Sequence, residues 1–134
     1  MATVVVETFI ETTPAQVWDA ARDYGALHTR LVPGFVTATE VVSKEGTPVR
    51  IVQFGSGAVA RETMVTVDDE QRRVVWSIRG ETVRHHNGAL RIEGVEGGCR
   101  VEWTADILPA TLAEIFEPAM RQGLAAMKAH FEAA

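Results

Sequence analysis

The C-terminal segment, from Thr111 to the end of the chain, carries the pattern that constrains the fold most. Apolar residues recur there every three or four positions, which is the spacing of one face of an α-helix. At 1.5 Å per residue such a helix would be about 34 Å long, enough to cross a small sheet. The predicted apolar face comprises Leu112, Ile115, Phe116, Ala119, Met120, Gly123, Met127 and Phe131.

Two residues of this helix are unusual for a helix interior. Pro118 has no backbone N–H, so it predicts a kink in the first third of the helix. Gly123 lies on the apolar face and leaves a notch where a side chain would have been. The notch has two interpretations, close packing of the helix on a sheet or room for a ligand.

The chain before this helix reads mostly as short strands separated by turns. Val4–Glu11 is the first predicted strand, and Thr13-Pro14 then favours the start of a short helix that ends near Arg22. A second short helix is expected over Asp23–Val32, up to the Pro33-Gly34 break. Further strands are expected at Phe35–Ser43, Pro48–Phe54, Ala58–Val67, Arg72–Arg79, Val83–Gly94 and Cys99–Leu108.

This order of elements predicts an α+β fold. A curved antiparallel sheet of about seven strands would grip the long C-terminal helix over a cavity, with two short helices after the first strand. The 134 residues fit a single domain, residues 1–134, with one core. Hydrophobic residues at 46% and charged residues at 23% are typical of a globular protein.

Charge and cysteine content exclude several classes of protein. A formal net charge of −5, without a cluster of Lys and Arg on any predicted element, argues against a nucleic-acid-binding protein. The single Cys99 forms no internal disulfide. No apolar run reaches the ~18 residues of a membrane span, and the N-terminus lacks an export signal. We therefore expect a cytoplasmic protein, and its oligomeric state stays open.

Period-two alternation assigns inward faces to three of the predicted strands. The fourth strand is ambiguous. One face holds Ala58, Ala60, Glu62 and Met64, and the other, which alternation alone slightly favours as the buried one, holds Val59, Arg61, Thr63 and Val65. The apolar faces expected under the helix are Val74, Trp76 and Ile78, then His86, Gly88, Leu90 and Ile92, then Val101, Trp103, Ala105 and Ile107.

Three stretches of the chain resemble a known superfamily. FIETTPAQVWDAARDYGAL resembles its opening strand and capped helix, RETMVTVDDEQRRVVWSI a characteristic hairpin, and CRVEWTADILP a penultimate strand that ends in proline. This superfamily is SRPBCC, the START-like and birch-pollen-allergen-like helix-grip proteins, and the resemblance is to its polyketide cyclase/dehydrase-like branch. The resemblance covers nearly the whole chain and specifies fold far better than function.

The resemblance implies a cavity between sheet and helix. Members bind lipids, sterols, polyketides or other apolar molecules there, and a minority catalyse cyclisation, dehydration or hydrolysis. The cavity-facing strand glutamate of the superfamily falls on Glu62, which favours the Ala60, Glu62, Met64 face as the inner one. A position where many relatives have a tyrosine falls on His86, so any chemistry of that phenol does not carry over.

Glu62 and His86 are the candidate catalytic residues. Their strands are separated by one neighbour, so their backbones should lie roughly 10 Å apart, and the pair could act as base and acid on an enolisable ketone. The alternative is that Glu62 has a structural or binding role, held by buried waters or by an inward arginine. The candidate ligand-binding residues are Met64, Trp76, Ile78, Gly88, Leu90, Trp103, Phe116, Met120, Gly123 and Met127.

No metal or cofactor is expected, because the histidines have no partners at ligand spacing and no phosphate-binding loop is present. The leading hypothesis is a protein that carries or senses a small hydrophobic ligand, lipid-like or polyketide-like. The second is a polyketide cyclase or dehydratase that uses Glu62 and His86. A third, an interaction module whose ligand tunes a partner protein, has less support because the loop from Gly55 to Ala58 is too short for a lid.

Overall fold

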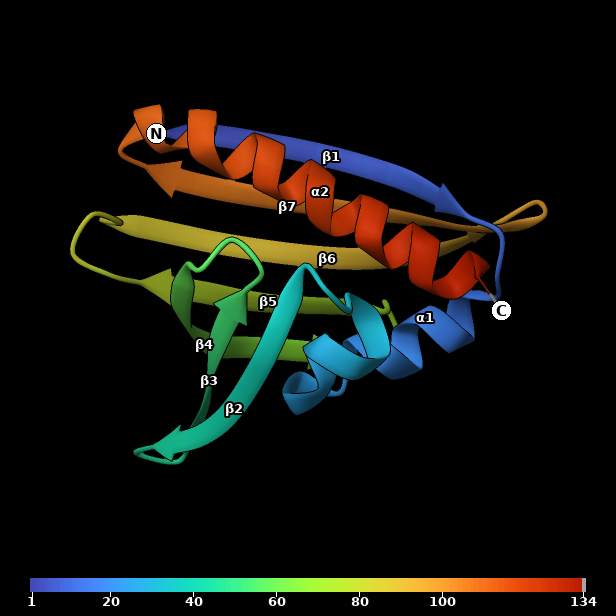
Figure 1. The fold of residues 1–134 in the computed structure, drawn as a ribbon, viewed down its shortest axis with the longest axis horizontal. Helices are drawn as coiled ribbons and strands as arrows, with labels where there is room; N and C mark the ends of the chain where they lie inside the picture. Colours follow the sequence, from blue (N-terminus) through green and yellow to red (C-terminus); the bar gives the residue numbers. More distant parts are fainter. Residues whose placement is uncertain (134) are drawn as a thin grey trace.

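The computed structural model describes residues 1–133, apart from the side chain of Lys44. All strands belong to one antiparallel sheet of seven, in the order β1-β7-β6-β5-β4-β3-β2 (Figure 1). The predicted α+β helix-grip architecture is therefore confirmed. The strands are β1 (Ala2–Ile10), β2 (Val36–Lys44), β3 (Thr47–Phe54), β4 (Val59–Asp68), β5 (Arg73–Arg79), β6 (His85–Val95) and β7 (Gly98–Leu108).

Two short segments follow β1. The α1 helix (Pro14–Ala21) begins with a capping box, in which the Thr13 hydroxyl accepts a hydrogen bond from the Gln16 amide and Pro14 occupies the first turn. The predicted helix over Asp23–Val32 is instead a 3-10 turn, η1 (Tyr24–Ala26), and a π-helical turn, η2 (Leu27–Leu31). The wider π turn closes through the bond from the Val32 amide to the Leu27 carbonyl. It leaves Leu27 and Leu31 both buried.

The C-terminal helix α2 (Ala113–Glu132) follows a 3-10 turn, η3 (Ala110–Leu112). It continues through Pro118, which lies near its beginning. Met120, Leu124 and Met127 are buried on its inner face, whereas Ile115 is 67% exposed although it belongs to the predicted apolar set. Among the helices of residues 1–133, none is long and apolar enough to cross a membrane.

The position of α2 over the sheet decides where the core ends. The helix lies along β1 and β7, and β2, β3 and β4 curve away from it at the other edge (Figure 1). β-Bulges in β2 and in β4, at Val36/Ala38 and Met64/Thr66, add to this bend. Much of the core therefore lies between α2, α1 and the β1, β7, β6 half of the sheet. It includes Ile10, Val17, Ile92, Val101, Ile107, Met120 and Met127.

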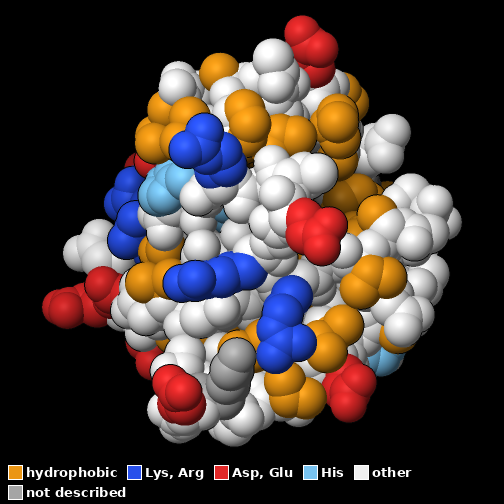
Figure 2. Space-filling model, turned by 90° about the vertical axis from the view of Figure 1, so that its left-hand side faces the viewer, with side chains coloured by type: hydrophobic (Ala, Val, Ile, Leu, Met, Phe, Trp, Pro, Cys, Tyr) orange, Lys and Arg blue, Asp and Glu red, His pale blue; other side chains and the backbone are white. Residues whose placement is uncertain are grey.

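Apolar side chains on the surface are scattered. At the end of the molecule where the chain starts, hydrophobic side chains alternate with basic and acidic ones (Figure 2). Val5, Val59 and Val65 are among the large apolar residues that are more than half exposed elsewhere on the strands. Single exposed apolar residues of this kind are normal in globular proteins.

Candidate ligand-binding cavity

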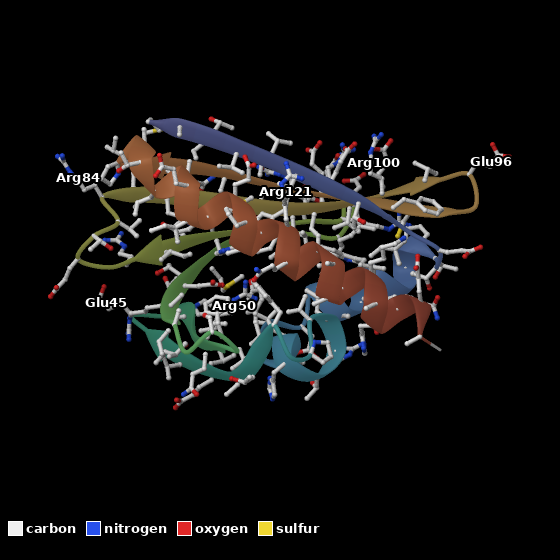
Figure 3. The ribbon with its side chains drawn as sticks, turned by 45° about the horizontal axis from the view of Figure 1, so that its top comes forward. Glu45, Arg50, Arg84, Glu96, Arg100 and Arg121 are labelled. Atoms are coloured by element: carbon white, nitrogen blue, oxygen red, sulfur yellow. The ribbon has the colours of Figure 1, made fainter. Side chains whose placement is uncertain are left out.

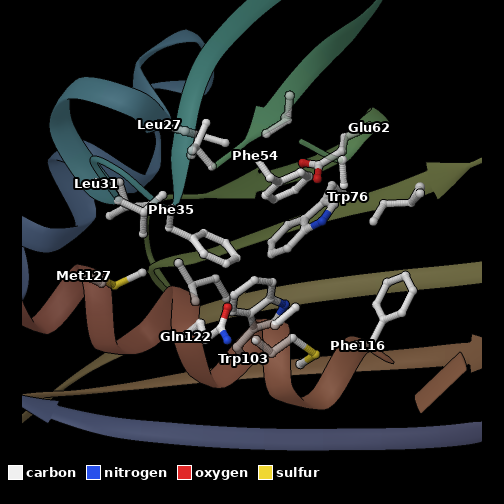
Figure 4. A pocket seen from close by; sticks show the side chains of 18 of the residues that line it. Leu27, Leu31, Phe35, Phe54, Glu62, Trp76, Trp103, Phe116, Gln122 and Met127 are labelled. Carbon is white, nitrogen blue, oxygen red and sulfur yellow. The ribbon is translucent and has the colours of Figure 1, made fainter. Parts of the chain in front are cut away.

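A cavity of about 680 Å³ lies between the concave face of the sheet and α2. Its volume falls in the range of small-molecule binding sites, which is about 300–1,000 Å³. Side chains from η2, from six of the strands and from α2 form its walls, and most of them are apolar (Figure 4). The apolar walls include Leu27, Leu31, Phe35, Val52, Phe54, Trp76, Ile78, Leu90, Trp103, Phe116, Met120 and Met127.

Aromatic pairs make up much of these walls. Phe35 and Phe54 meet edge to face, with ring centroids 5.4 Å apart, and Trp76 and Trp103 lie 5.9 Å apart. Edge-to-face and tilted contacts of this kind are preferred by aromatic rings, so the pairs stabilise the positions of the four rings. Ile115 borders the same space and is largely exposed, so the cavity reaches the surface beside the start of α2.

Three polar residues are buried in this apolar surrounding. Arg50, Glu62 and His86 are each 5% exposed or less. The register explains why they meet: Arg50 of β3 pairs with Glu62 of β4, and Glu62 pairs with Ile78 of β5. Ile78 in turn bonds to His86 of β6. The three side chains thus lie in one row across the sheet, which we call the polar row.

Arg50 and Glu62 form a buried ion pair. The Arg50 Nε donates to Glu62 Oε1 at 2.7 Å. The guanidinium also stacks over the Trp76 ring, 5.4 Å from its centroid, which is a favourable cation–π distance. Arg50 lies within the fold, whereas Arg84 and Arg100 project from the surface (Figure 3). Glu62 is therefore held by an inward arginine, one of the alternatives that the sequence left open.

His86 is oriented by a backbone hydrogen bond. The amide of Ile78 donates to His86 Nδ1 at 3.0 Å. The paired residues of β5 and β6 end at Trp76 and Gly88, so the imidazole takes the place of a backbone acceptor just beyond that point. Because Nδ1 accepts, the proton of the neutral ring resides on Nε2. The ring lies beside Phe116, with centroids 5.5 Å apart.

The surroundings of His86 favour its neutral form. Burial is the main cause that lowers its pKa, from 6.5 to about 4, and repulsion from the neighbouring His85 acts in the same direction. Asp106 and a backbone hydrogen bond oppose this shift of the pKa more weakly. At neutral pH the cavity therefore contains an uncharged imidazole with one N–H donor.

The polar row presents unused hydrogen-bonding atoms to the cavity. No described residue bonds to the Arg50 Nη atoms, Glu62 Oε2 or His86 Nε2. Among the side-chain nitrogen and oxygen atoms of residues 1–133 that are fully shielded from solvent, Trp103 Nε1 is the one that lacks a hydrogen-bond partner. The unused atoms of the polar row are therefore accessible, and the space that all three side chains border is the cavity.

Most of the residues predicted from the sequence border the cavity. Glu62 and His86 do so, together with Trp76, Ile78, Leu90, Trp103, Phe116, Met120 and Met127. Glu62 and His86 do not bond to each other, because Arg50 and the Ile78 amide are their partners.

Met64, Gly88 and Gly123 lie outside the lining. Met64 is buried in the core beside its cross-strand partner Trp76. A Cβ at Gly88 would lie 2.9 Å from the His86 ring, so this glycine makes room for the imidazole. A Cβ at Gly123 would lie 2.8 Å from the Trp103 ring and 3.0 Å from Phe35. Those two rings fill the notch, and Gly123 serves close packing rather than a ligand.

Sequence reasoning missed Arg50, the partner of Glu62. The signal was present, since alternation places Arg50 on the same face of its strand as Val52 and Phe54, both of which line the cavity. The contributions of Leu27, Leu31 and Phe35 were missed as well. They come from segments without regular alternation.

The described residues include no cluster of three or more potential metal ligands.

Residues 1–132 match the protein family described as "Polyketide cyclase / dehydrase and lipid transport". The chain belongs to this family. It is thereby a member of the SRPBCC superfamily that its motifs resemble. A search of curated proteins found no match.

Solved structures share the fold at low sequence identity. XoxI from Bacillus cereus is 22% identical with a TM-score of 0.83, and the match covers 98% of this chain and 96% of that one. Ara h 8.0201 is 16% identical with a TM-score of 0.75, over 99% of both chains. Truncated norcoclaurine synthase from Thalictrum flavum is 16% identical with a TM-score of 0.70, over 96% of this chain and 92% of that one.

The buried ion pair generates a prediction about stability. Arg50→Met should lower the free energy of unfolding by about 3 kcal/mol, because it leaves the Glu62 carboxylate buried without its partner. The double variant Arg50→Met/Glu62→Leu should recover part of that loss. Urea denaturation measures both. Arg61→Met, at an exposed position of β4, is the matched control. If Arg50→Met lowers the free energy of unfolding no more than this control does, the stabilising role of the ion pair is contradicted.

His86 generates a prediction about pH. Its folded pKa of about 4 lies below the ordinary 6.5, so its contribution to stability is present above pH 6.5 and is lost as the pH falls towards 4. At about 1.4 kcal/mol per pKa unit, wild type should lose between about 2 and 3 kcal/mol through this group by roughly pH 4.5.

His86→Gln lacks the titrating group and should lose correspondingly less between about pH 7.5 and 4.5. Urea denaturation at both pH values measures the difference, with His130→Gln on α2 as the control. An equal decline of wild type and His86→Gln would show that His86 is not held neutral by the fold.

Proposed function

We propose that the protein binds a small, mainly apolar molecule in the cavity between the sheet and α2. The observation that carries this proposal is the cavity of about 680 Å³, with apolar walls and a few polar atoms directed into it. Apolar walls supply affinity by burying ligand surface, and a small number of fixed polar groups supplies orientation. The match to a family described by polyketide cyclisation and lipid transport supports the same function.

Packing arguments also favour a ligand. Protein interiors are packed as densely as organic crystals, with few voids larger than a water molecule. In this cavity Phe35 and Trp103 pack against Gly123 at one side and leave the remaining space unfilled. Small residues, Gly55 and Ala58 among them, line part of the space. In a protein that carries or senses an apolar molecule, the ligand would fill such a space.

The proposal predicts that an apolar molecule accompanies the purified protein. Native mass spectrometry, together with solvent extraction, should detect a bound small molecule that is released on denaturation. Ala119→Trp, which puts a large ring into the cavity wall, should abolish this species. Ala125→Trp, at an exposed position of the same helix, should retain it.

Two outcomes would contradict the proposal. One is wild-type protein that carries no ligand and binds no apolar probe. The other is equal ligand content in the Ala119→Trp and Ala125→Trp variants.

A second candidate function is a cyclase or dehydratase. The unused Glu62 Oε2 and the His86 Nε2 proton both border the cavity, so a ketone could lie between them. The carboxylate would remove a proton next to the carbonyl, while the imidazole N–H would donate to the carbonyl oxygen. Among the similar structures, norcoclaurine synthase is an enzyme by name.

A β-hydroxyketone tests this second candidate. With 4-hydroxy-4-(2-naphthyl)butan-2-one, loss of the proton next to the carbonyl and of the hydroxyl group as water would give a conjugated enone, visible by its absorbance. Glu62→Gln should reduce the rate by at least about a hundredfold while the ketone still binds, and His86→Phe should also reduce it. Equal rates in wild type and both variants would refute the enzyme.

A further inference from the structure

We infer that the cavity selects neutral apolar molecules that carry a ketone or hydroxyketone group, and discriminates against carboxylic acids of the same size. The inference rests on the proposed binding function and names its ligand class. It follows from the charge balance and the hydrogen-bonding roles of the polar row, Arg50, Glu62 and His86.

The charge balance of the cavity is already complete. Arg50 and Glu62 are the charged residues that line it, and each side chain is at most 6% exposed. The positive charge of Arg50 is neutralised by Glu62 at 2.7 Å. A ligand carboxylate would bring a second negative charge into this buried pair, and the described lining residues include no second cation to receive it. Burying an uncompensated charge is costly, so a fatty acid or another organic acid should bind poorly.

The hydrogen-bonding roles favour a ligand with a carbonyl oxygen. His86 offers a donor at Nε2, because its Nδ1 accepts from the Ile78 amide. Arg50 offers its Nη atoms as further donors, because Nε is the atom that bonds to Glu62. A carbonyl oxygen can accept from these groups without adding charge.

Glu62 adds a complementary acceptor. Its Oε2 is unused and can accept a hydrogen bond from a hydroxyl group of the ligand. Donors and an acceptor thus lie in one row across β3, β4 and β6. A molecule with a carbonyl and a hydroxyl group at one end of an apolar body matches that row. A pure hydrocarbon would instead cover these polar groups without replacing their hydrogen bonds to water.

Three naphthalenes of nearly equal size test the inference. 2-Acetylnaphthalene carries a ketone, 2-naphthoate carries a carboxylate at neutral pH, and 2-ethylnaphthalene carries no oxygen. Equilibrium dialysis against the full-length protein gives the three dissociation constants. The ketone should bind at least about tenfold more tightly than either of the other two probes. A factor of this size corresponds to one well-made hydrogen bond, or to the cost of burying one uncompensated charge that the ketone avoids.

Two variants separate recognition from a general effect on the cavity. Glu62→Gln removes the negative charge that balances Arg50, so the affinity for 2-naphthoate relative to that for the ketone should rise by about tenfold. His86→Phe removes the Nε2 donor and should weaken the ketone without weakening 2-ethylnaphthalene. Circular dichroism and thermal denaturation check that both variants fold.

Each outcome has one interpretation. Equal binding of all three probes, or tighter binding of 2-naphthoate by wild type, would overturn the inference and leave the proposed binding function intact. If Glu62→Gln keeps the wild-type ratio of affinities for 2-acetylnaphthalene and 2-naphthoate, the argument from charge balance is overturned. Absence of binding by all three probes, in protein that also carries no ligand, would contradict the binding function and the inference together.

Discussion

The structure depends on where its long helix packs. α2 lies along β1 and β7, and its buried residues contact one half of a strongly bent sheet. The other half, from β5 to β2, therefore has a concave face that α2 does not cover completely. η2 and Phe35 close part of the gap, and the remainder is the cavity. The cavity is thus a consequence of a strongly curved sheet that a single helix covers only in part.

The cavity keeps charged groups without carrying net charge. A lone carboxylate in an apolar pocket would cost much free energy. Arg50 offsets that cost, because its guanidinium forms an ion pair with Glu62 and lies over the Trp76 ring. His86 adds polarity without charge, because its Nδ1 is engaged by a backbone amide and burial lowers its pKa. The polar row can consequently orient a ligand by hydrogen bonds while the walls remain apolar.

The sequence predicted the periodic parts of this arrangement and little that depended on contacts between them. Alternation along β5, β6 and β7 identified Trp76, Leu90 and Trp103, because a strand with one buried face repeats every two residues. The partner of Glu62 required the register of β3 against β4, which alternation within one strand does not contain. Likewise the sequence places Gly123 as a notch on the apolar face of the helix, but only the folded chain shows that Phe35 and Trp103 fill this notch.

The neutral charge of the polar row and the donor that it presents to the cavity depend on the protonation of His86. Two-dimensional NMR of the imidazole nitrogens tests this most directly, through the ¹⁵N shifts of His86 near neutral pH. We expect a protonated Nε2 and an unprotonated Nδ1 that accepts a hydrogen bond, with the Nε2 signal shifting when 2-acetylnaphthalene is added. A His86 protonated on both nitrogens near neutral pH, or protonated on Nδ1 alone, would contradict it.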